Sequence, residues 1–134
     1  MTERHERGVL DTSVVIDLER LPEARLPVHS AVAAITLAEL AAGLHTTHDP
    51  SEQGARLLRL QVVEANFDAL PFDAAAARHY GHLVALALAA GQNPRPRRLD
   101  LMIAATAVSH GLPLYTRNAK DFRALGEAVT LLAV

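Results

Sequence analysis

Short apolar runs alternate with helical patterns along the 134 residues of this chain. The apolar runs end at polar or turn residues and are mostly too short for helices, which predicts strands. We predict five of them, over residues 8–11, 31–35, 69–72, 114–116 and 129–134. Between the runs, apolar positions recur every three or four residues, as in helices. The predicted helices begin near residue 12 and extend over 36–45, 51–66 with Ser51 as cap, 73–91 with Asp73 as cap, 101–110 and 119–125.

Strands that alternate with helices in this way are typical of a parallel sheet with helices on both faces. The helix predicted at 101–110 fits that arrangement, because its first eight residues carry no charge and only Thr106 is polar. A helix that is apolar on every side lies in the interior of a domain. We therefore expect one α/β domain over residues 1–134, with a mostly parallel central sheet. The pattern does not predict the order of the strands.

Composition excludes several classes of protein. Half of the residues are hydrophobic and 21% are charged, which is not the composition of a disordered chain. The chain has no cysteine, so disulfides, zinc–thiolate sites and thiol nucleophiles are excluded. The opening MTERHERG leads into no apolar segment of a secretory signal, and the longest low-charge run, 83–91, is too short to cross a bilayer. We expect a cytoplasmic protein without membrane association.

Charge is distributed unevenly along the chain. The formal net charge is −2, which argues against a general nucleic-acid binder. Residues 1–90 hold 7 arginines and 12 acids, a balance of −5, whereas residues 91–134 hold 5 arginines, one lysine and 3 acids, a balance of +3. This local basic region surrounds Asp100 and Asp121 and suits an anionic ligand.

Four acidic residues are predicted to lie at one edge of the sheet. Ligands of open parallel sheets bind at the carboxyl ends of the strands. Asp11 ends the first predicted strand, Glu39 lies about one helical turn after the second, and Asp121 follows the strand at 114–116. Asp100 opens the buried helix, so it joins the other three acids if that helix starts at the same edge.

These residues also have structural explanations. Thr36 and Glu39 have the spacing of a capping box, and Asp11 and Asp100 are of the type that commonly caps helices. Asp17, on the helical face that follows the first strand, is predicted to be solvated. A common role is nevertheless favoured for the four acids, because carboxylates gathered in one place repel one another unless a cation is present. Ligand sets of oxygen alone suit Mg²⁺ or Mn²⁺.

Three arginines, Arg95, Arg97 and Arg98, directly precede Asp100. A carboxylate-held divalent cation beside a basic loop suits a phosphate substrate. Arg97 and Arg98 are therefore candidates for holding substrate phosphates, with Arg95 further out, and the alternative is a solvated loop. Spacing alone thus predicts metal-dependent phosphoryl chemistry.

Four segments of the chain resemble the motifs of PIN-domain ribonucleases and, within that family, of the VapC-type toxins of bacterial toxin–antitoxin pairs. The segments are VLDTS at 9–13, ITLAELAAG at 35–43, RLDLMIAATA at 98–107 and LYTRNAKDF at 114–122. They occur in the family's order and together cover nearly the whole chain. The resemblance implies a three-layer α/β/α sandwich and a Mg²⁺- or Mn²⁺-dependent endoribonuclease.

The resemblance also implies roles for individual residues. Asp11 and Asp100 would be the principal metal ligands, and Glu39 would hold a second metal ion or orient the water. Asp121 would complete the acidic set, with Asn118 as a ligand through water. The hydroxyls that would orient the carboxylates are those of Thr12, Ser13 and Thr116. The family further implies a homodimer, inhibition by a VapB-type antitoxin whose tail inserts near the acids, and structured RNA such as tRNA as substrate.

Other classes fit less well. A receiver-like phosphoacceptor domain needs an acidic pair after the first strand and a late lysine, and here there is no such pair and Lys120 is the only lysine. A histidine-based ribonuclease is not favoured either, because His79 and His82 have no evident third partner. A non-catalytic binding module with helix-capping acids is the alternative outside the enzymes. Such a module would tolerate Asp100→Asn.

Overall fold

The computed structural model describes residues 4–134, so the first three residues of the MTERHERG start lie outside the described part. Five strands form one sheet in which every neighbouring pair is parallel, in the order β3-β2-β1-β4-β5. They are β1 (Arg7–Leu10), β2 (His29–Ala33), β3 (Asp68–Leu70), β4 (Leu114–Thr116) and β5 (Leu131–Ala133). The α-helices are α1 (Thr12–Ile16), α2 (Ala34–Gly43), α3 (Pro50–Asn66), α4 (Ala74–Ala89) and α5 (Arg98–Ser109). Short 3-10 segments are η1 (Leu18–Arg20), η2 (Glu23–Arg25), η3 (Arg95–Arg97) and η4 (Ala119–Ala128).

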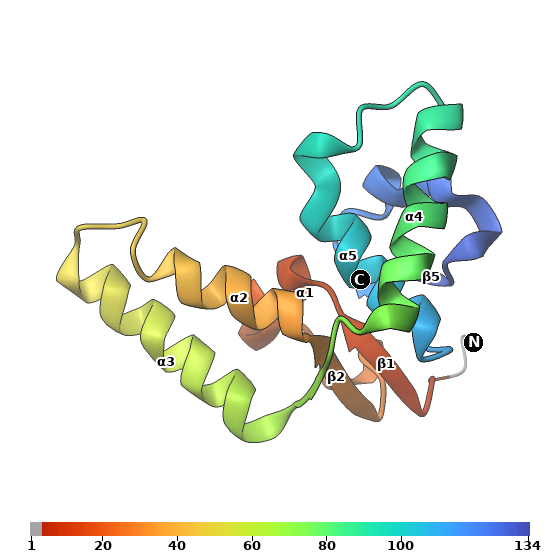
Figure 1. Cartoon of the computed structure of the whole chain (residues 1–134). Coiled ribbons are helices and arrows are strands. Elements are labelled where there is room, and N and C mark those ends of the chain that lie inside the picture. Colours follow the sequence, from red (N-terminus) through yellow and green to blue (C-terminus); the bar gives the residue numbers. More distant parts are fainter. Residues whose placement is uncertain (1–3) are drawn as a thin grey trace.

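Helices cover both faces of the sheet (Figure 1). Successive side chains of a strand point to opposite faces, so Val9 of β1 and Leu114 of β4 pack in one hydrophobic cluster with α4 and α5. Their neighbours Leu10 and Tyr115 pack in a second cluster with α1 and α3. The three-layer α/β/α sandwich with a parallel central sheet is confirmed.

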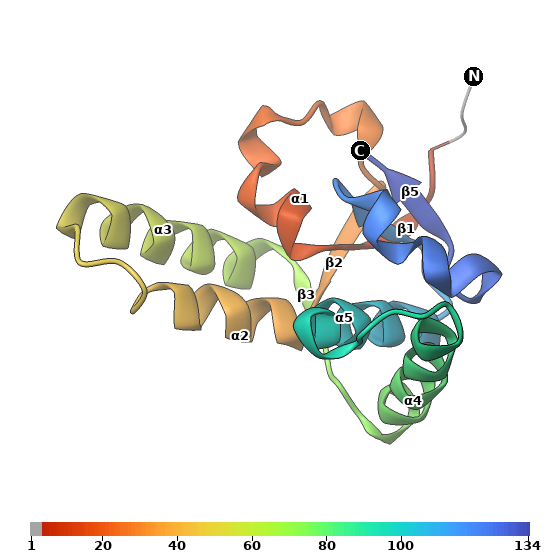
Figure 2. The same cartoon turned by 90° about the horizontal axis from the view of Figure 1, so that it is seen from above.

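The apolar helix predicted after residue 100 is α5, which packs against the sheet. In α5, the side chains of Leu101, Ile103, Ala104, Ala105, Thr106 and Ala107 are all buried. Helix α4 packs along it, as Figure 2 shows. Small alanines on α5 let its neighbours approach closely. The helix begins at the edge where β1 and β2 end, and it contacts α2 there.

Helices α2 and α3 form a hairpin that projects from the sandwich (Figure 2). Arg56 of α3 holds its tip, because its guanidinium donates to the carbonyl oxygen of Gly43 at 2.7 Å and to the Thr46 hydroxyl at 2.8 Å. An ion pair with Glu52, one turn earlier, orients Arg56. The hairpin therefore stands beside the acidic edge of the sheet as a defined element.

Some predicted bounds are wrong, for physical reasons. Strand β3 ends at Leu70 and does not reach 72, because Pro71 has no N–H for a ladder hydrogen bond. Helix α3 begins at Pro50, and the Asp49 side chain accepts a hydrogen bond from the Ser51 amide. Asp49, and not Ser51, is therefore the cap, with proline at the first helical position. Within residues 4–134, no helix is long and apolar enough to cross a membrane.

Candidate active site

Asp11 lies at the carboxyl end of β1, and its side chain is buried. One carboxylate oxygen, Oδ1, accepts from the Thr12 amide at 2.9 Å, so Asp11 caps α1. The other, Oδ2, accepts from the hydroxyls of Ser13 at 2.8 Å and Thr116 at 2.9 Å. These donors hold the buried carboxylate in one orientation. Thr116 is the last residue of β4, so the pairing of β1 with β4 builds this network.

Glu39 lies on α2 and faces the same edge. Its Oε1 accepts from the Thr12 hydroxyl at 2.8 Å, and that hydroxyl also contacts the hydroxyl of Thr36 at 3.0 Å. The capping box, the structural alternative for Thr36 and Glu39, does not form, because α2 begins at Ala34 and no side chain caps it. Burial raises the pKa of Glu39, the Thr12 hydroxyl opposes this, and the charge of Asp11 raises it further. Thr12 thus links two of the candidate acids.

Asp100 lies in the first turn of α5, not at its N-cap, because the helix already begins at Arg98. Burial first, and then the negative charges of Asp11 and Glu39, raises the pKa of Asp100 from 3.8 to about 6. Arg97 lowers it, and Asp121 adds a smaller increase. Three other carboxylates therefore act on Asp100, although burial is the largest cause of its shift.

Arg97 and Asp121 form an ion pair next to Asp100. The Arg97 Nη1 atom lies 3.0 Å from Asp121 Oδ2, and both side chains are partly exposed. Together with Asp100 they line a cleft of about 10 Å³, which is roughly the room that one water needs. Arg98 is not part of this group, since its guanidinium is exposed and donates to the backbone carbonyl oxygen of Arg95 at 2.9 Å.

Asn118 lies at the margin of the site. Its backbone N–H donates to the Thr116 hydroxyl at 3.0 Å, which orients that hydroxyl toward Asp11. The side chain of Asn118 is exposed. The next residue toward β4 forms a contact that the sequence did not indicate. Arg117 pairs with Asp17 at 3.5 Å, so the expectation that Asp17 is merely solvated is wrong. This pair ties α1 to the segment after β4.

The carboxylates are close, yet in these side-chain positions they do not enclose one ion. Among residues 4–134, no group of three or more His, Asp or Glu side chains is near enough to hold a metal ion jointly. Mg²⁺ is often held by only one or two carboxylates, with waters completing its shell. Asp100 accepts no hydrogen bond from the described residues, and Asp11 is the carboxylate with the largest effect on its pKa. An oxygen-only pair of this kind fits a hard divalent cation.

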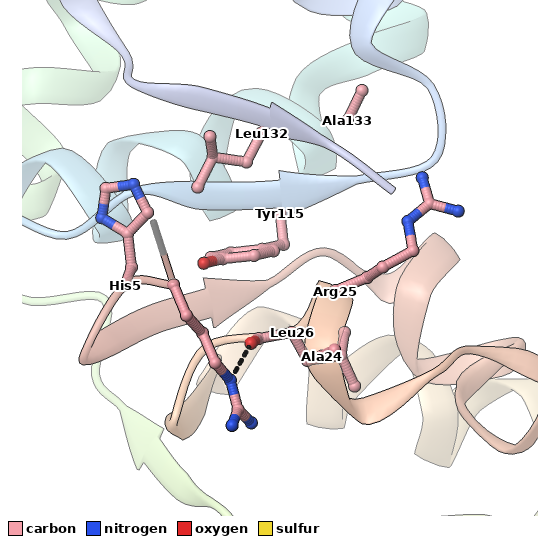
Figure 3. A pocket seen from close by; sticks show the side chains of 8 residues that line it. His5, Ala24, Arg25, Leu26, Tyr115, Leu132 and Ala133 are labelled. Carbon is pink, nitrogen blue, oxygen red and sulfur yellow. Dashed lines mark hydrogen bonds between the residues drawn. The ribbon is translucent and has the colours of Figure 1, made fainter. Parts of the chain in front are cut away.

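Two cavities near the sheet differ in their relation to the acids. A pocket of about 380 Å³ between α2, α3 and the end of α1 shares Thr12 and Glu39 with the candidate site. A second cavity of about 300 Å³ lies at Tyr115 and is lined by Arg4, His5 and Arg25 (Figure 3). No candidate acid lines that second cavity, so it is separate from the site.

The chain is similar to known proteins over most of its length. The family model described as the PIN domain matches residues 8–128. Ribonuclease VapC5 of Mycobacterium tuberculosis is 39% identical over 92% of this chain and 91% of its own length. The tRNA(fMet)-specific endonuclease VapC of Shigella flexneri is 34% identical over 71% of this chain and 68% of its own length.

Among solved structures, one neighbour is VapBC-5 from Mycobacterium tuberculosis, a member of the VapBC family of toxin–antitoxin systems. It superposes with a TM-score of 0.85 at 37% identity, over 96% of this chain and 99% of the other. The match to the family model spans most of the chain, and the VapC relatives cover its length. The chain belongs to the PIN-domain family and, within that family, to the VapC ribonucleases.

Proposed function

We propose that this protein is the toxin of a toxin–antitoxin pair, a metal-dependent endoribonuclease that cuts tRNA or another structured RNA. The observation that carries the proposal is the gathering of acids at the carboxyl edge of the sheet, where Thr12 joins Asp11 to Glu39 and Asp100 lies in the first turn of α5, with the pKa of Asp100 raised to about 6 by burial and by the neighbouring acids. Repulsion of this kind is relieved by a cation held among the carboxylates. Similarity to the tRNA(fMet)-specific endonuclease VapC of Shigella flexneri supports tRNA as the substrate class.

Asp11 and Asp100 are the residues that would hold Mg²⁺ or Mn²⁺. Asp11 is already oriented by three hydrogen bonds, and Asp100, in the first turn of α5, is near enough for the charge of Asp11 to raise its pKa. Asp121 completes the acidic set, or holds Arg97 in place, and Asn118 contributes through a water. When bound, the metal ion activates a water and neutralises charge that develops on the phosphodiester.

Glu39 is placed to orient the attacking water, or to help hold a second ion. The Thr12 hydroxyl occupies Oε1, so Oε2 is the atom that accepts the proton as the water oxygen bonds to phosphorus. The phosphorus–oxygen bond to one ribose breaks, and the departing oxygen takes a proton from solvent. The raised pKa of Glu39 favours this role, because a more basic carboxylate accepts a proton more readily.

Arg97 is the candidate for binding a substrate phosphate close to the acids. In this structure its guanidinium pairs with Asp121. A bound phosphate would therefore displace Asp121 from the guanidinium or share the guanidinium with it. Arg98 and Arg95 lie further out, and we propose that they contribute only longer-range attraction for the RNA backbone.

We propose a VapB-type antitoxin as the protein partner and a homodimer as the assembly. The antitoxin is supported by the similarity to VapBC-5, a member of the VapBC family of toxin–antitoxin systems. A tail that carries a basic residue would fit the acids, because their negative charge attracts it when no metal ion is bound.

The test is cleavage of a total tRNA pool by purified protein in Mg²⁺, in Mn²⁺ and in EDTA, beside an Asp100→Asn variant. We expect discrete fragments that need the metal and are absent with the variant. Intact RNA in every lane, from folded protein free of antitoxin, would favour the non-catalytic binding module. Retained cleavage by Asp100→Asn would remove Asp100 from the reaction.

A further inference from the structure

The pocket of about 380 Å³ beside Glu39 has no part in the function proposed above. It lies between α2, α3 and the end of α1 and is lined by Thr12, Ile16, Glu39, Gly43, Arg56 and Arg59, among others. Thr12 and Glu39 belong both to this pocket and to the acidic site. A strand of RNA that reaches the acids can therefore continue into the pocket.

The two arginines of the pocket differ in one respect. Arg56 is fully engaged, with the Gly43 carbonyl, the Thr46 hydroxyl and the Glu52 carboxylate as partners. Arg59, one turn later on the same face of α3, forms no ion pair and no side-chain hydrogen bond within residues 4–134.

Arg59 is also partly buried. Its side chain lines the pocket, and its guanidinium has no partner within residues 4–134 that an entering anion would have to displace. The natural partner for its planar donors is a phosphate or a carboxylate, which accepts two parallel hydrogen bonds. The pocket thus presents an unpaired cation next to the place where a phosphodiester is cut.

The walls of the pocket suit a nucleotide. Ile16, at the end of α1, is 49% exposed and offers an apolar surface to a base or ribose. Gly43 leaves the opposite wall open, since a side chain at that position would have no neighbouring atom within 4 Å. The volume lies within the usual range for ligand pockets.

We propose that this pocket is a subsite for the RNA strand and that Arg59 binds a phosphate adjacent to the one that is cut. The inference rests on the proposed ribonuclease function. Arg97, on η3, and Arg59, on α3, then hold the strand on either side of the acids, so that the scissile phosphate lies over Asp11 and Asp100. Arg59 is a positioning residue, since phosphate contacts set the register of a bound strand.

The experiment compares Arg59→Gln, Arg59→Lys and the matched control Arg78→Gln with the full-length wild-type protein. Arg78 is exposed on α4 and forms no ion pair within the described residues, so its loss changes the net charge equally. Filter binding of a total tRNA pool is measured in EDTA at graded NaCl, and initial cleavage rates are measured in Mg²⁺.

For Arg59→Gln we expect tRNA binding about 10-fold weaker, as for the loss of one charged hydrogen-bonded contact. The slope of log affinity against log salt should fall by about 0.7–0.9. KM should rise, while kcat should stay within about threefold of the wild-type value, because the contact is made equally in the bound substrate and in the transition state. Arg59→Lys should restore most of the affinity, and Arg78→Gln should behave as wild type.

Equal binding and equal KM for Arg59→Gln and Arg78→Gln would overturn the subsite. A variant that binds tRNA normally but loses affinity for a VapB-type antitoxin would assign Arg59 to the protein partner instead, and would also overturn it. The proposed function is tested separately. If wild-type protein binds tRNA through Arg59 but cleaves no RNA in the presence of Mg²⁺, the pocket still binds RNA and the ribonuclease function is contradicted.

Discussion

The hydroxyl of Thr116 donates a hydrogen bond of 2.9 Å to Asp11 Oδ2, although the two residues are 105 positions apart in the chain. Both are buried, at the carboxyl ends of the neighbouring strands β1 and β4. The contact joins the centre of the sheet to the candidate site, because the same carboxylate also accepts from Ser13 and caps α1. Orientation of Asp11 is therefore a property of the sheet itself.

Thr116→Val tests that orientation. The substitution keeps the shape of the side chain and removes the donor, so the buried Asp11 carboxylate keeps only one hydroxyl partner at Oδ2. We expect RNA cleavage to fall by roughly 10- to 100-fold, the usual effect of losing a residue that orients a metal ligand. Unfolding in urea should show a loss of about 1–3 kcal/mol.

Thr106→Val is the matched control for that variant. Thr106 is equally buried, but its hydroxyl donates to the Met102 carbonyl within α5 and contacts no acid. It should keep wild-type cleavage whatever its stability. Equal activities of Thr116→Val and Thr106→Val would contradict the role given to Thr116.

Asp100→Asn should stabilise the metal-free protein at neutral pH. The folded-state pKa of Asp100, about 6, lies above its ordinary 3.8, so the folded state binds a proton more tightly than the unfolded chain. Stability from this group is therefore greatest at low pH and is lost as pH rises through about 6. At pH 7.5 the ionised carboxylate is a cost that asparagine removes, roughly 1 kcal/mol after allowance for solvent screening.

Thermal unfolding in EDTA provides the measurement. The variant should melt roughly 3–5 °C above wild type at pH 7.5, and the difference should shrink toward pH 4.5, where wild-type Asp100 is protonated. A difference that is the same at both pH values would show that charge repulsion among the acids is not its cause.

Mg²⁺ should stabilise wild-type protein and not Asp100→Asn. A ligand that binds only the folded state raises stability by an amount that grows with its concentration above Kd. Millimolar Mg²⁺ or Mn²⁺ should therefore raise the wild-type melting temperature, and an excess of EDTA should return it to the lower value. Equal shifts in both proteins would place the ion elsewhere on the molecule.

A double-mutant cycle separates the roles of Arg97 and Asp121. If Asp121 acts chiefly by holding Arg97, Arg97→Gln, Asp121→Asn and the double variant should all raise KM to a similar extent, since the two residues act as one unit. If Asp121 also serves the metal, Asp121→Asn should lower kcat as well. Arg78→Gln, which removes an exposed arginine of α4 that forms no ion pair within residues 4–134, is the control and should leave both constants within about twofold.

The sequence predicted much of this fold, because periodicity reports whether a segment is a strand or a helix and where a strand ends. It also indicated which acids follow those ends, and Asp11 and Glu39 lie at the edge that was expected. It did not predict that β4 pairs with β1, since register and strand order depend on contacts between distant segments. The Thr116 contact with Asp11 depends on that pairing.

The contacts of long charged side chains were also not predicted from the sequence. Arg97 and Arg98 are adjacent in sequence, yet one pairs with Asp121 and the other turns to a backbone carbonyl. Arg59 was not distinguished from any other helical arginine, because only the packing of α3 against α2 places it beside Glu39. For such residues the partner is decided by tertiary structure, and no local spacing reveals it.

Gly8→Ala should destabilise the sheet at its centre. A Cβ atom at Gly8 would lie 2.5 Å from Cε1 and 2.9 Å from Cδ1 of the Tyr115 ring, which is buried and packed in the second hydrophobic cluster. Relief of the overlap requires the ring to shift toward the cavity of about 300 Å³ that it borders and to leave its contacts in the cluster, so we expect overpacking to cost about 1–3 kcal/mol in urea unfolding. Gly54→Ala is the control, because a Cβ at Gly54 in α3 would meet nothing within 4 Å. That change should stabilise the helix by about 0.5–1 kcal/mol, and a Gly8→Ala protein as stable as wild type would mean that the Tyr115 ring does not fill this space in solution.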